Sequence, residues 1–361
     1  MRGRLFCAAL AAAALLTGCS PLPYPREMED MALLRTLGVD RAGDGLSVTA
    51  STGPQANGQH QGEQEPALVL SARRDSLSAA CLAMQSLSYR YVFFGYVDQL
   101  LLGEDLARAD VRPVLDACAR SGELSLGAQL WLTLDQTAAE AIRAGGSGGV
   151  DRQLITLGTD GEMGLSLLPR TAGEVYADLL DRGCAYVPAL TWGEEDAPLT
   201  AAGYGVLRDG ALKGVLTGGA ARGLERLTGG GQADIWTQSL GENRVVLRAE
   251  GAGVTCLPRR GGPGTLSGLT VTCRVRASCE ENNTPLTSGE RDRAKRAVVA
   301  RETAQIRAAL TQLQAWGTDC TGLGLRAAAR SGGWTETGEC WPERFARLPI
   351  SLTIQVQLQD G

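Results

Sequence analysis

The chain has 361 residues, of which 40 are acidic and 35 basic, so its net charge is −5 at pH 7. An acidic chain of this kind is a poor match for nucleic acid, whose binding proteins neutralise phosphates with basic side chains. Hydrophobic residues make up 44% and charged residues 21%, which is the composition of a globular chain and not of a disordered one.

The start of the chain has the pattern of a bacterial lipoprotein signal. Two arginines lie within the first four residues, and residues 5–16 form an apolar run that is too short to span a bilayer. The stretch Leu-Thr-Gly-Cys at 16–19 resembles a lipobox, in which the cysteine is acylated before cleavage. We predict a signal peptide over 1–18, a lipid on Cys19 and a lipid-anchored spacer over 19–26. The alternative is an ordinary signal peptide that is cut near Cys19.

Residues 27–190 are predicted to form one or more mixed α/β domains, because strand and helix patterns alternate along them. The predicted elements are a helix over 27–34, a strand around 37–40, a hairpin turn at 43–45, a returning strand over 46–52, a polar loop over 53–62, a strand over 67–72, a helix capped by Asp75 or Ser76, a buried strand over 91–102, a helix from Glu104, a helix over 111–124 and a strand over 125–134.

Three further features follow along the chain, the last of them beyond residue 190. The stretch "GGSGG" at 145–149 indicates a glycine-rich joint or loop. A helix is expected over 171–182, with Thr171 as its cap and an apolar stripe. Around Arg208-Asp209-Gly210, two short apolar strands predict a hairpin. The stripe of the helix consists of Val175, Leu179 and Leu180.

Residues 191–361 are predicted to form the C-terminal α/β domain or domains. A long amphipathic helix is expected over 290–316, with one apolar face, and an alternating strand over 350–358. The polar side of that strand carries hydroxyl and amide groups without charge, so it faces either water or another subunit. The apolar face of the helix is marked by Val299, Ile306, Leu310 and Leu313.

No catalytic, cofactor or metal site is predicted. "GGSGG" formally matches a nucleophile elbow around Ser147, but a helical pattern precedes it where that motif requires a strand. Residues 322–327 loosely match a dinucleotide fingerprint, but they follow the long helix and are interpreted as its exit. The sequence contains one histidine, His60, and no CxxC pair. The histidine and cysteine residues therefore do not suggest a metal site.

The pairing of the cysteines stays open. An even number outside the cytoplasm permits disulfides, whereas apolar neighbours favour buried free thiols. Cys320 with Cys340 is the pair to test first. Apart from Cys7 and Cys19, the cysteines are Cys81, Cys118, Cys184, Cys256, Cys273, Cys279, Cys320 and Cys340.

Taken in order, several stretches resemble the Ger(x)C family, the lipoprotein C subunits of GerA-type nutrient germinant receptors in endospore-forming bacteria. The lipobox is followed by "REMEDMALLRTLGVDR", later by "EDLAR", by "AAGYGVLRDGALKGVLTGGAARGLERLTG" and by the closing "WPERFARLPISLTIQVQLQDG". The likeness spans residues 16 to 361. The matching positions include Glu27, Glu29, Asp30, Gly38, Asp40, Glu104, Ala107, Arg108, Arg222, Gly223 and Leu224.

The resemblance implies an elongated α+β protein of two to three mixed-sheet domains packed with helices. It further implies a non-catalytic receptor subunit on the outer face of the spore inner membrane, which works with two integral-membrane receptor subunits. We expect Glu27, Glu29 and Asp30, which lie close to the anchor, to contact such a partner. The alternative functions are an extracytoplasmic solute-binding lipoprotein of a transporter and, less well supported, an envelope hydrolase.

Overall fold

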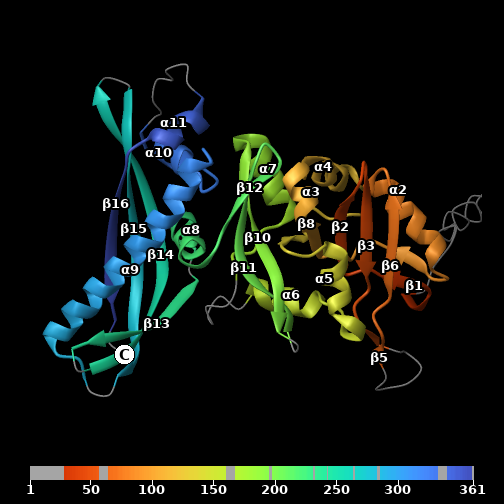
Figure 1. The fold of residues 1–361 in the computed structure, drawn as a ribbon, viewed down its shortest axis with the longest axis horizontal. Coiled ribbons are helices and arrows are strands. Elements are labelled where there is room, and N and C mark those ends of the chain that lie inside the picture. The colour runs from red at the N-terminus through yellow and green to blue at the C-terminus, as the bar shows by residue number, and fades with distance from the viewer. Residues whose placement is uncertain are drawn as a thin grey trace, which may run out of the picture.

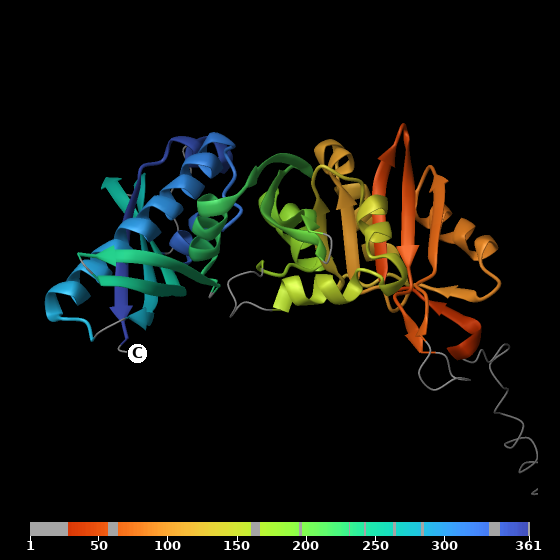
Figure 2. The same ribbon diagram turned by 60° about the horizontal axis from the view of Figure 1, so that its bottom comes forward.

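The chain folds into two lobes that lie side by side in an elongated molecule (Figures 1 and 2). The N-lobe, residues 28–216, is built on an eight-stranded sheet, and the C-lobe, residues 218–359, on a four-stranded sheet. Helices pack on both sheets, so the predicted α+β class is confirmed. The computed structural model describes residues 28–56, 64–159, 167–194, 197–230, 232–241, 243–262, 265–282, 285–331 and 340–359.

The N-lobe sheet is mixed, with a parallel centre and antiparallel edges. Its strands are β2 (Thr36–Ala42), β3 (Gly45–Ser51), β6 (Val69–Arg74), β8 (Gln99–Gly103), β9 (Gln129–Thr133), β10 (Cys184–Glu194), β11 (Ala197–Arg208) and β12 (Ala211–Leu216). Their order is β12-β11-β10-β9-β8-β2-β3-β6, with parallel pairing from β10 to β2. The sheet thus extends past residue 190 and includes the predicted β11–β12 hairpin, in which Asp209 and Gly210 adopt positive φ.

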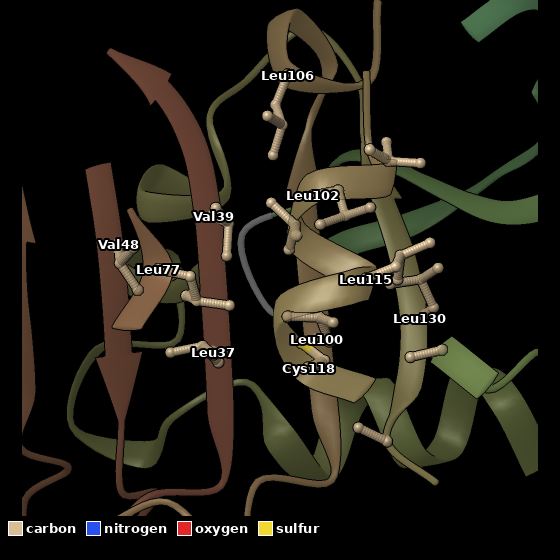
Figure 3. Packing of buried hydrophobic residues seen from close by; sticks show 14 of the residues in the cluster. Leu37, Val39, Val48, Leu77, Leu100, Leu102, Leu106, Leu115, Cys118 and Leu130 are labelled. Carbon is tan, nitrogen blue, oxygen red and sulfur yellow. The ribbon is translucent and has the colours of Figure 1, made fainter. Parts of the chain in front are cut away.

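Helices cover both faces of this sheet, because its strands alternate apolar residues toward two cores. One face packs against α2 (Leu77–Met84), α3 (Glu104–Ala109), α4 (Arg112–Arg120) and α7 (Ala172–Arg182), and the other against α5 (Ala138–Ala144) and α6 (Asp151–Thr159). In β8, Leu100 and Leu102 belong to the first core, which Figure 3 shows, and Leu101 to the second. The glycine-rich stretch forms a short 3-10 turn, η3 (Gly146–Gly148), between α5 and α6.

The helix caps predicted from the sequence are present. The Ser76 hydroxyl accepts a hydrogen bond from the backbone of Ala79, and Thr171 forms a reciprocal capping box with Glu174. Such caps satisfy backbone N–H groups that the first turn leaves unpaired. The apolar stripe of α7 was predicted in part wrongly, because Leu180 is exposed while Val175 and Leu179 are buried.

Two predicted elements of the N-lobe were wrong. Residues 28–33 form a 3-10 turn, η1 (Met28–Asp30), and a short strand, β1 (Met31–Leu33), where a helix over 27–34 was expected. The predicted strand over 91–102 is two strands, β7 (Tyr91–Phe93) and β8, separated by a turn closed by a Val97 N–H to Phe94 C=O bond. Both differences have one cause, since β1 pairs in parallel with β7 in a separate two-stranded sheet.

The remaining short elements of this lobe are η2 (Gln85–Leu87), which continues from α2, and a two-stranded sheet in the predicted polar loop. That sheet consists of β4 (Gln55–Ala56) and β5 (Gln64–Glu65). These elements do not alter the order of the main sheet.

The C-lobe sheet has the order β13-β14-β15-β16, and helices pack on one of its faces (Figure 1). Its last strand runs parallel to its neighbour, and the predicted alternation is confirmed, because Ser351, Thr353, Gln355, Gln357 and Gln359 are all exposed. The strands are β13 (Ala233–Leu240), β14 (Asn243–Gly262), β15 (Thr265–Asn282) and β16 (Ile350–Leu358). The helices are α8 (Gly218–Thr228), α9 (Ser288–Ala315), α10 (Leu323–Ser331) and α11 (Trp341–Arg347).

The long predicted helix is confirmed as α9, which begins with a capping box between Thr287 and Glu290. Ile306, Leu310 and Leu313 face the core as expected. Val299 does not, because the neighbouring Val298 is the residue that is fully buried. The long helix therefore packs on the sheet through a face that is rotated by about one residue at this turn.

A single apolar cluster continues from one lobe into the other. It joins Leu216 of the N-lobe sheet to Leu224 and Leu310 of the C-lobe helices. At the same junction the ring of Trp316 lies on Gly214, where an added Cβ would come within 2.3 Å of a ring carbon. The two lobes are therefore in direct apolar contact and are not separated by a linker.

Candidate functional site

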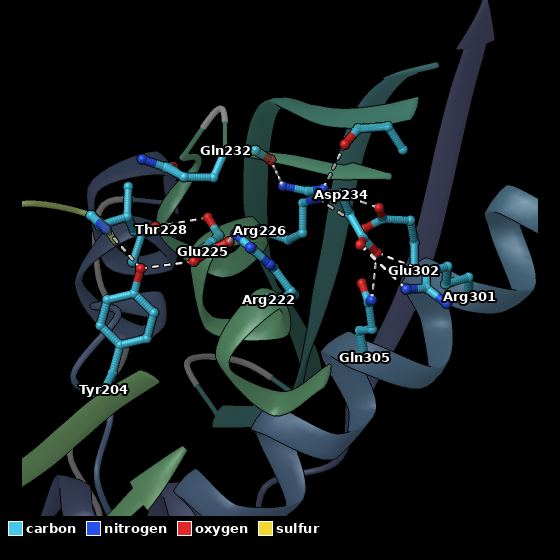
Figure 4. Close-up of polar contacts among 12 residues, drawn as sticks. Tyr204, Arg222, Glu225, Arg226, Thr228, Gln232, Asp234, Arg301, Glu302 and Gln305 are labelled. Carbon is cyan, nitrogen blue, oxygen red and sulfur yellow. Dashed lines mark hydrogen bonds and ion pairs between the residues drawn. The ribbon is translucent and has the colours of Figure 1, made fainter. Parts of the chain in front are cut away.

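A buried polar network lies at the junction of the lobes (Figure 4). Tyr204 of β11 donates a hydrogen bond of 2.8 Å to Glu225 of α8, and its hydroxyl accepts one of 2.7 Å from the backbone of Leu168. Arg222 donates to the other carboxylate oxygen of Glu225 at 2.9 Å. Burial raises the pKa of Glu225 above its usual value, and the bonds from Arg222 and Tyr204 oppose that rise.

Beside it lies an ion pair that is almost completely shielded from water. Arg226 of α8 donates to both carboxylate oxygens of Glu302 of α9, at 2.9 and 3.2 Å, and neither side chain is more than 1% exposed. The guanidinium also donates to the carbonyls of Gln232 and Ala249. Because a buried charge is tolerated only when it is paired and hydrogen-bonded, this geometry indicates a fixed structural clamp between α8, α9 and the sheet.

A third group ties α9 to the edge strand β13. Arg301 binds Asp234 through two N–H groups, at 2.7 and 3.2 Å, and Gln305 donates to the same carboxylate at 2.8 Å. Burial acts to raise the pKa of Asp234, but these hydrogen bonds prevail and hold it below its ordinary value. The guanidinium of Arg301 lies 4.6 Å from the centre of the Trp236 ring.

Gly223 explains how these charges come together. An added Cβ on this residue would lie 2.2 Å from the carbonyl oxygen of Gln305, so α8 and α9 meet backbone to backbone at this point. The sequence pattern marked Arg222 and Gly223 but not the α9 residues at this junction, Glu302 and Gln305, because these lie about eighty residues further along the chain. The signal that could have found them is that they share the buried face of the long helix with Val298 and Ile306.

The "GVD" stretch of the N-terminal motif positions a helix. The carboxylate of Asp40 accepts hydrogen bonds from the backbone N–H groups of Ala138 and Ala139, at 2.7 and 3.0 Å, and so caps α5 across the sheet. Gly38 leaves room for the same helix, since a Cβ there would lie 2.8 Å from Ile142. Burial raises the pKa of Asp40 and these two hydrogen bonds oppose the rise.

A second buried carboxylate performs the same task in the C-lobe. Asp319 accepts hydrogen bonds from the backbones of Leu323 and Gly324, at 2.8 and 2.7 Å, and from the indole of Trp341 at 3.0 Å. Burial raises its pKa, against the effect of these bonds. The stretch 322–327, interpreted above as the exit of the long helix, instead opens α10.

The "EDLAR" stretch forms α3 and borders an open groove of about 450 Å³. The groove is lined by charged and small residues, and Arg108 pairs along the helix with Glu104. A ligand site usually encloses its ligand with apolar walls and a few polar groups. This groove lacks such walls, since its lining consists of Arg41, Gly43, Asp44, Asp105, Arg108 and Ala109.

The cysteines in the described residues are free, so the pair Cys320–Cys340 is not formed. Cys320 is buried and Cys340 is exposed. Burial raises the pKa of the Cys184 and Cys273 thiols to about 12. Within the described ranges no group of three or more His, Cys, Asp or Glu side chains could hold a metal ion.

Of the three residues predicted to contact a partner, the structure describes Glu29 and Asp30, which lie at the outer end of the N-lobe. Asp30 is exposed in η1, and Glu29 belongs to the same turn. Cys19 and Glu27 lie outside the described residues. Nothing in the described residues tests the lipid on Cys19 or the partner contact, so both stay predictions.

The comparisons with known proteins agree with this arrangement. A family model described as "Spore germination protein N-terminal domain" matches residues 25–191, and one described as "Spore germination B3/ GerAC like, C-terminal" matches residues 202–361. The chain belongs to this spore germination family. Its fold is similar to that in "Crystal Structure of the GerBC protein", with a TM-score of 0.58 and 14% identity over 89% of this chain and 96% of the other.

Two further findings complete this picture of the spore germination chain. No curated protein matches the sequence. In the part of the chain that the structure describes, no helix combines the length and the apolar character that a membrane span requires. The solved structure therefore supports the fold, and the two family models support the membership.

Proposed function

We propose that this chain is a lipid-anchored, non-catalytic subunit of a spore nutrient germinant receptor, needed for receptor assembly and for nutrient-triggered germination. The observation that carries the proposal is that the two family models together span both lobes. The lipobox at Cys19 supports a lipid anchor, and together with the family membership it supports a position on the outer face of the spore inner membrane.

The internal chemistry supports a scaffold. The buried charges at the junction pair with one another, as Arg226 does with Glu302, and they hold the helices on the sheet. A partner subunit would have to bind exposed residues elsewhere on the molecule. We propose that two integral-membrane receptor subunits bind the N-lobe end that carries Glu27, Glu29 and Asp30.

The test is made in spores of the source organism. Deleting the chain should abolish germination in response to nutrients while leaving a trigger that bypasses receptors effective. Cys19→Ser should reduce the amount of the chain in the inner-membrane fraction and reduce nutrient response. Normal nutrient germination in the deletion strain would refute the proposal.

The partner contact has its own test. Reversing the charges with Glu27→Lys, Glu29→Lys and Asp30→Lys should lower co-purification with the two membrane subunits, while the same change at Glu280 and Glu281, which are exposed at the far lobe, should not. Unchanged co-purification would show that the partner binds elsewhere.

A further inference from the structure

The outer end of the N-lobe carries an apolar face. Strands β1 and β7 pair in parallel there, and neither contains a charged residue. Their central residues, Ala32 and Val92, are buried, whereas the flanking residues of both strands are half-buried and point away from the core. We call these outward residues the tip face; they are Met31, Leu33, Tyr91 and Phe93.

Exposed apolar side chains widen the tip face. Tyr89, just before β7, is 92% exposed, and Tyr96, just after it, is 50% exposed with its ring 5.6 Å from that of Phe93. Three of the seven tyrosines of the chain thus lie within eight residues. Exposed apolar side chains that lie together mark an interaction surface. Three further exposed apolar residues lie on neighbouring elements: Met28 on η1, Leu82 on α2, and Leu87 on η2, where Gln85 bonds the backbone of Val92.

The length of the preceding chain limits where this face can be. Only eight residues separate Cys19 from Met28, and that many residues reach at most about 30 Å when extended. If Cys19 carries the lipid, as the proposed function requires, the tip is held close to the bilayer. In Figure 1, β1 and α2 lie at the end of the molecule opposite the C-lobe, so the C-lobe points away from the anchor.

We propose that the tip face rests on the lipid bilayer and forms a second membrane contact beside the acyl anchor. Tyrosine is enriched at the boundary between headgroups and acyl chains, because its ring is apolar and its hydroxyl polar. Leucine, methionine and phenylalanine supply the apolar area that enters this boundary. The tip therefore orients the whole chain on the membrane, which a flexible tether alone would not do.

The charges near the tip indicate that binding does not require an anionic lipid headgroup. The exposed Asp30 and the acidic residues before it would repel an anionic surface, and the guanidinium of Arg90 lies 5.5 Å from the ring of Tyr89. Contact should thus depend on apolar area and not on headgroup charge. We expect it on zwitterionic phosphatidylcholine and in high salt, which screens attraction between exposed charges.

The first test uses the lipidated full chain on phosphatidylcholine vesicles whose acyl chains carry bromine, a quencher of tryptophan fluorescence. No tryptophan precedes Trp131, so Tyr89→Trp adds a reporter at the tip alone. The matched control is Leu180→Trp, on α7, where Leu180 is 66% exposed. The added emission of the tip reporter should be quenched, and that of the control should not.

Failure of this proposal and failure of the anchor are distinguishable. If the chain floats with the vesicles but the tip reporter is not quenched, the tip does not touch lipid and the proposal is wrong, while the anchor stands. If the chain does not float, the anchor is wrong and the tip proposal falls with it. Cys19→Ser, which lacks the acyl chains, should float less than the lipidated chain, and equal flotation would mean that the lipid is not on Cys19.

A second test separates lipid from protein as the occupant. A photoreactive amino acid in place of Tyr89, in spores, should form adducts with phospholipid. Adducts with a receptor subunit or with a second copy of this chain would overturn the proposal and identify the tip as a protein interface. The same photoreactive residue at Leu180 shows the background level.

Discussion

The hydroxyl of Tyr204 donates a hydrogen bond to the buried carboxylate of Glu225, and this bond joins the last hairpin of the N-lobe sheet to the first helix of the C-lobe. The same hydroxyl accepts from the backbone of Leu168. One oxygen atom therefore satisfies groups from two other segments of the chain.

We expect Tyr204→Phe to lower the free energy of unfolding by about 1–3 kcal/mol, because it leaves a buried acceptor and a backbone donor without their partner. Urea unfolding of the full chain measures this. Tyr176→Phe is the control, since Tyr176 bonds Asp116 on the opposite face and is only half-buried, and it should cost less. Equal losses in the two variants would mean that the junction bond has no special weight.

Removing Arg226 should be the more severe change. Arg226→Met leaves Glu302 buried without a counter-charge, which typically destabilises a protein by about 3–5 kcal/mol. The exposed pair of Arg120 and Asp116 gives the matched comparison, where Arg120→Met should change stability by less than about 1 kcal/mol. Calorimetry of the two variants decides, and a small effect at Arg226 would contradict the clamp.

The close approach of α8 and α9 predicts opposite outcomes at two glycines of one helix. Gly223→Ala should destabilise the chain by about 1–3 kcal/mol, because its Cβ would collide with backbone. Gly219→Ala meets only a side-chain carbon at 3.5 Å and should be neutral or stabilising by up to about 1 kcal/mol. Thermal unfolding that ranks the two variants the other way would exclude the predicted collision.

Acid should weaken the tie between α9 and β13. The pKa of Asp234 lies below its ordinary value of 3.8 in the folded chain, so its bonds stabilise the fold fully above that value. This contribution is lost as the pH falls from 3.8 through the lower, folded-state pKa. Urea unfolding across this range should show the difference between the native chain and Asp234→Asn shrinking as the pH falls. A constant difference would contradict the prediction.

The cysteines should fall into two reactivity classes. Cys340 is exposed and should react at once with a thiol reagent near neutral pH. Cys118, Cys256 and Cys273 are buried, and burial raises their pKa to between about 11 and about 12, so they should react only on unfolding. Cys340→Ser should remove the fast phase. If the native chain has no fast phase, Cys340 is paired.

Local patterns in the sequence predicted the elements that local physics determines. The alternation in β16, the Thr171 cap of α7 and the turn at Asp209-Gly210 each depend on neighbouring residues, and each is present. The helix expected over 27–34 is absent because β1 is stabilised by β7, sixty residues away. Because the two strands are so far apart in the sequence, a local sequence pattern does not reveal that they pair.

The same reason explains the site. The motif residues Gly38 and Asp40 were visible in the sequence. Their roles were not, because Gly38 leaves space for α5 and Asp40 caps it, and α5 lies about a hundred positions away. Likewise, Arg226 and Glu302 are each ordinary charged residues of helices until the fold brings them together. Sequence thus located the important segments and left the partners to the structure.

The apolar contact of Trp316 with Gly214 has a consequence for anyone who would divide this protein. A cut after residue 217 would expose the apolar surface of each lobe that the other lobe now buries. Neither fragment would then represent the intact molecule, and a strain that makes only one fragment should degrade it.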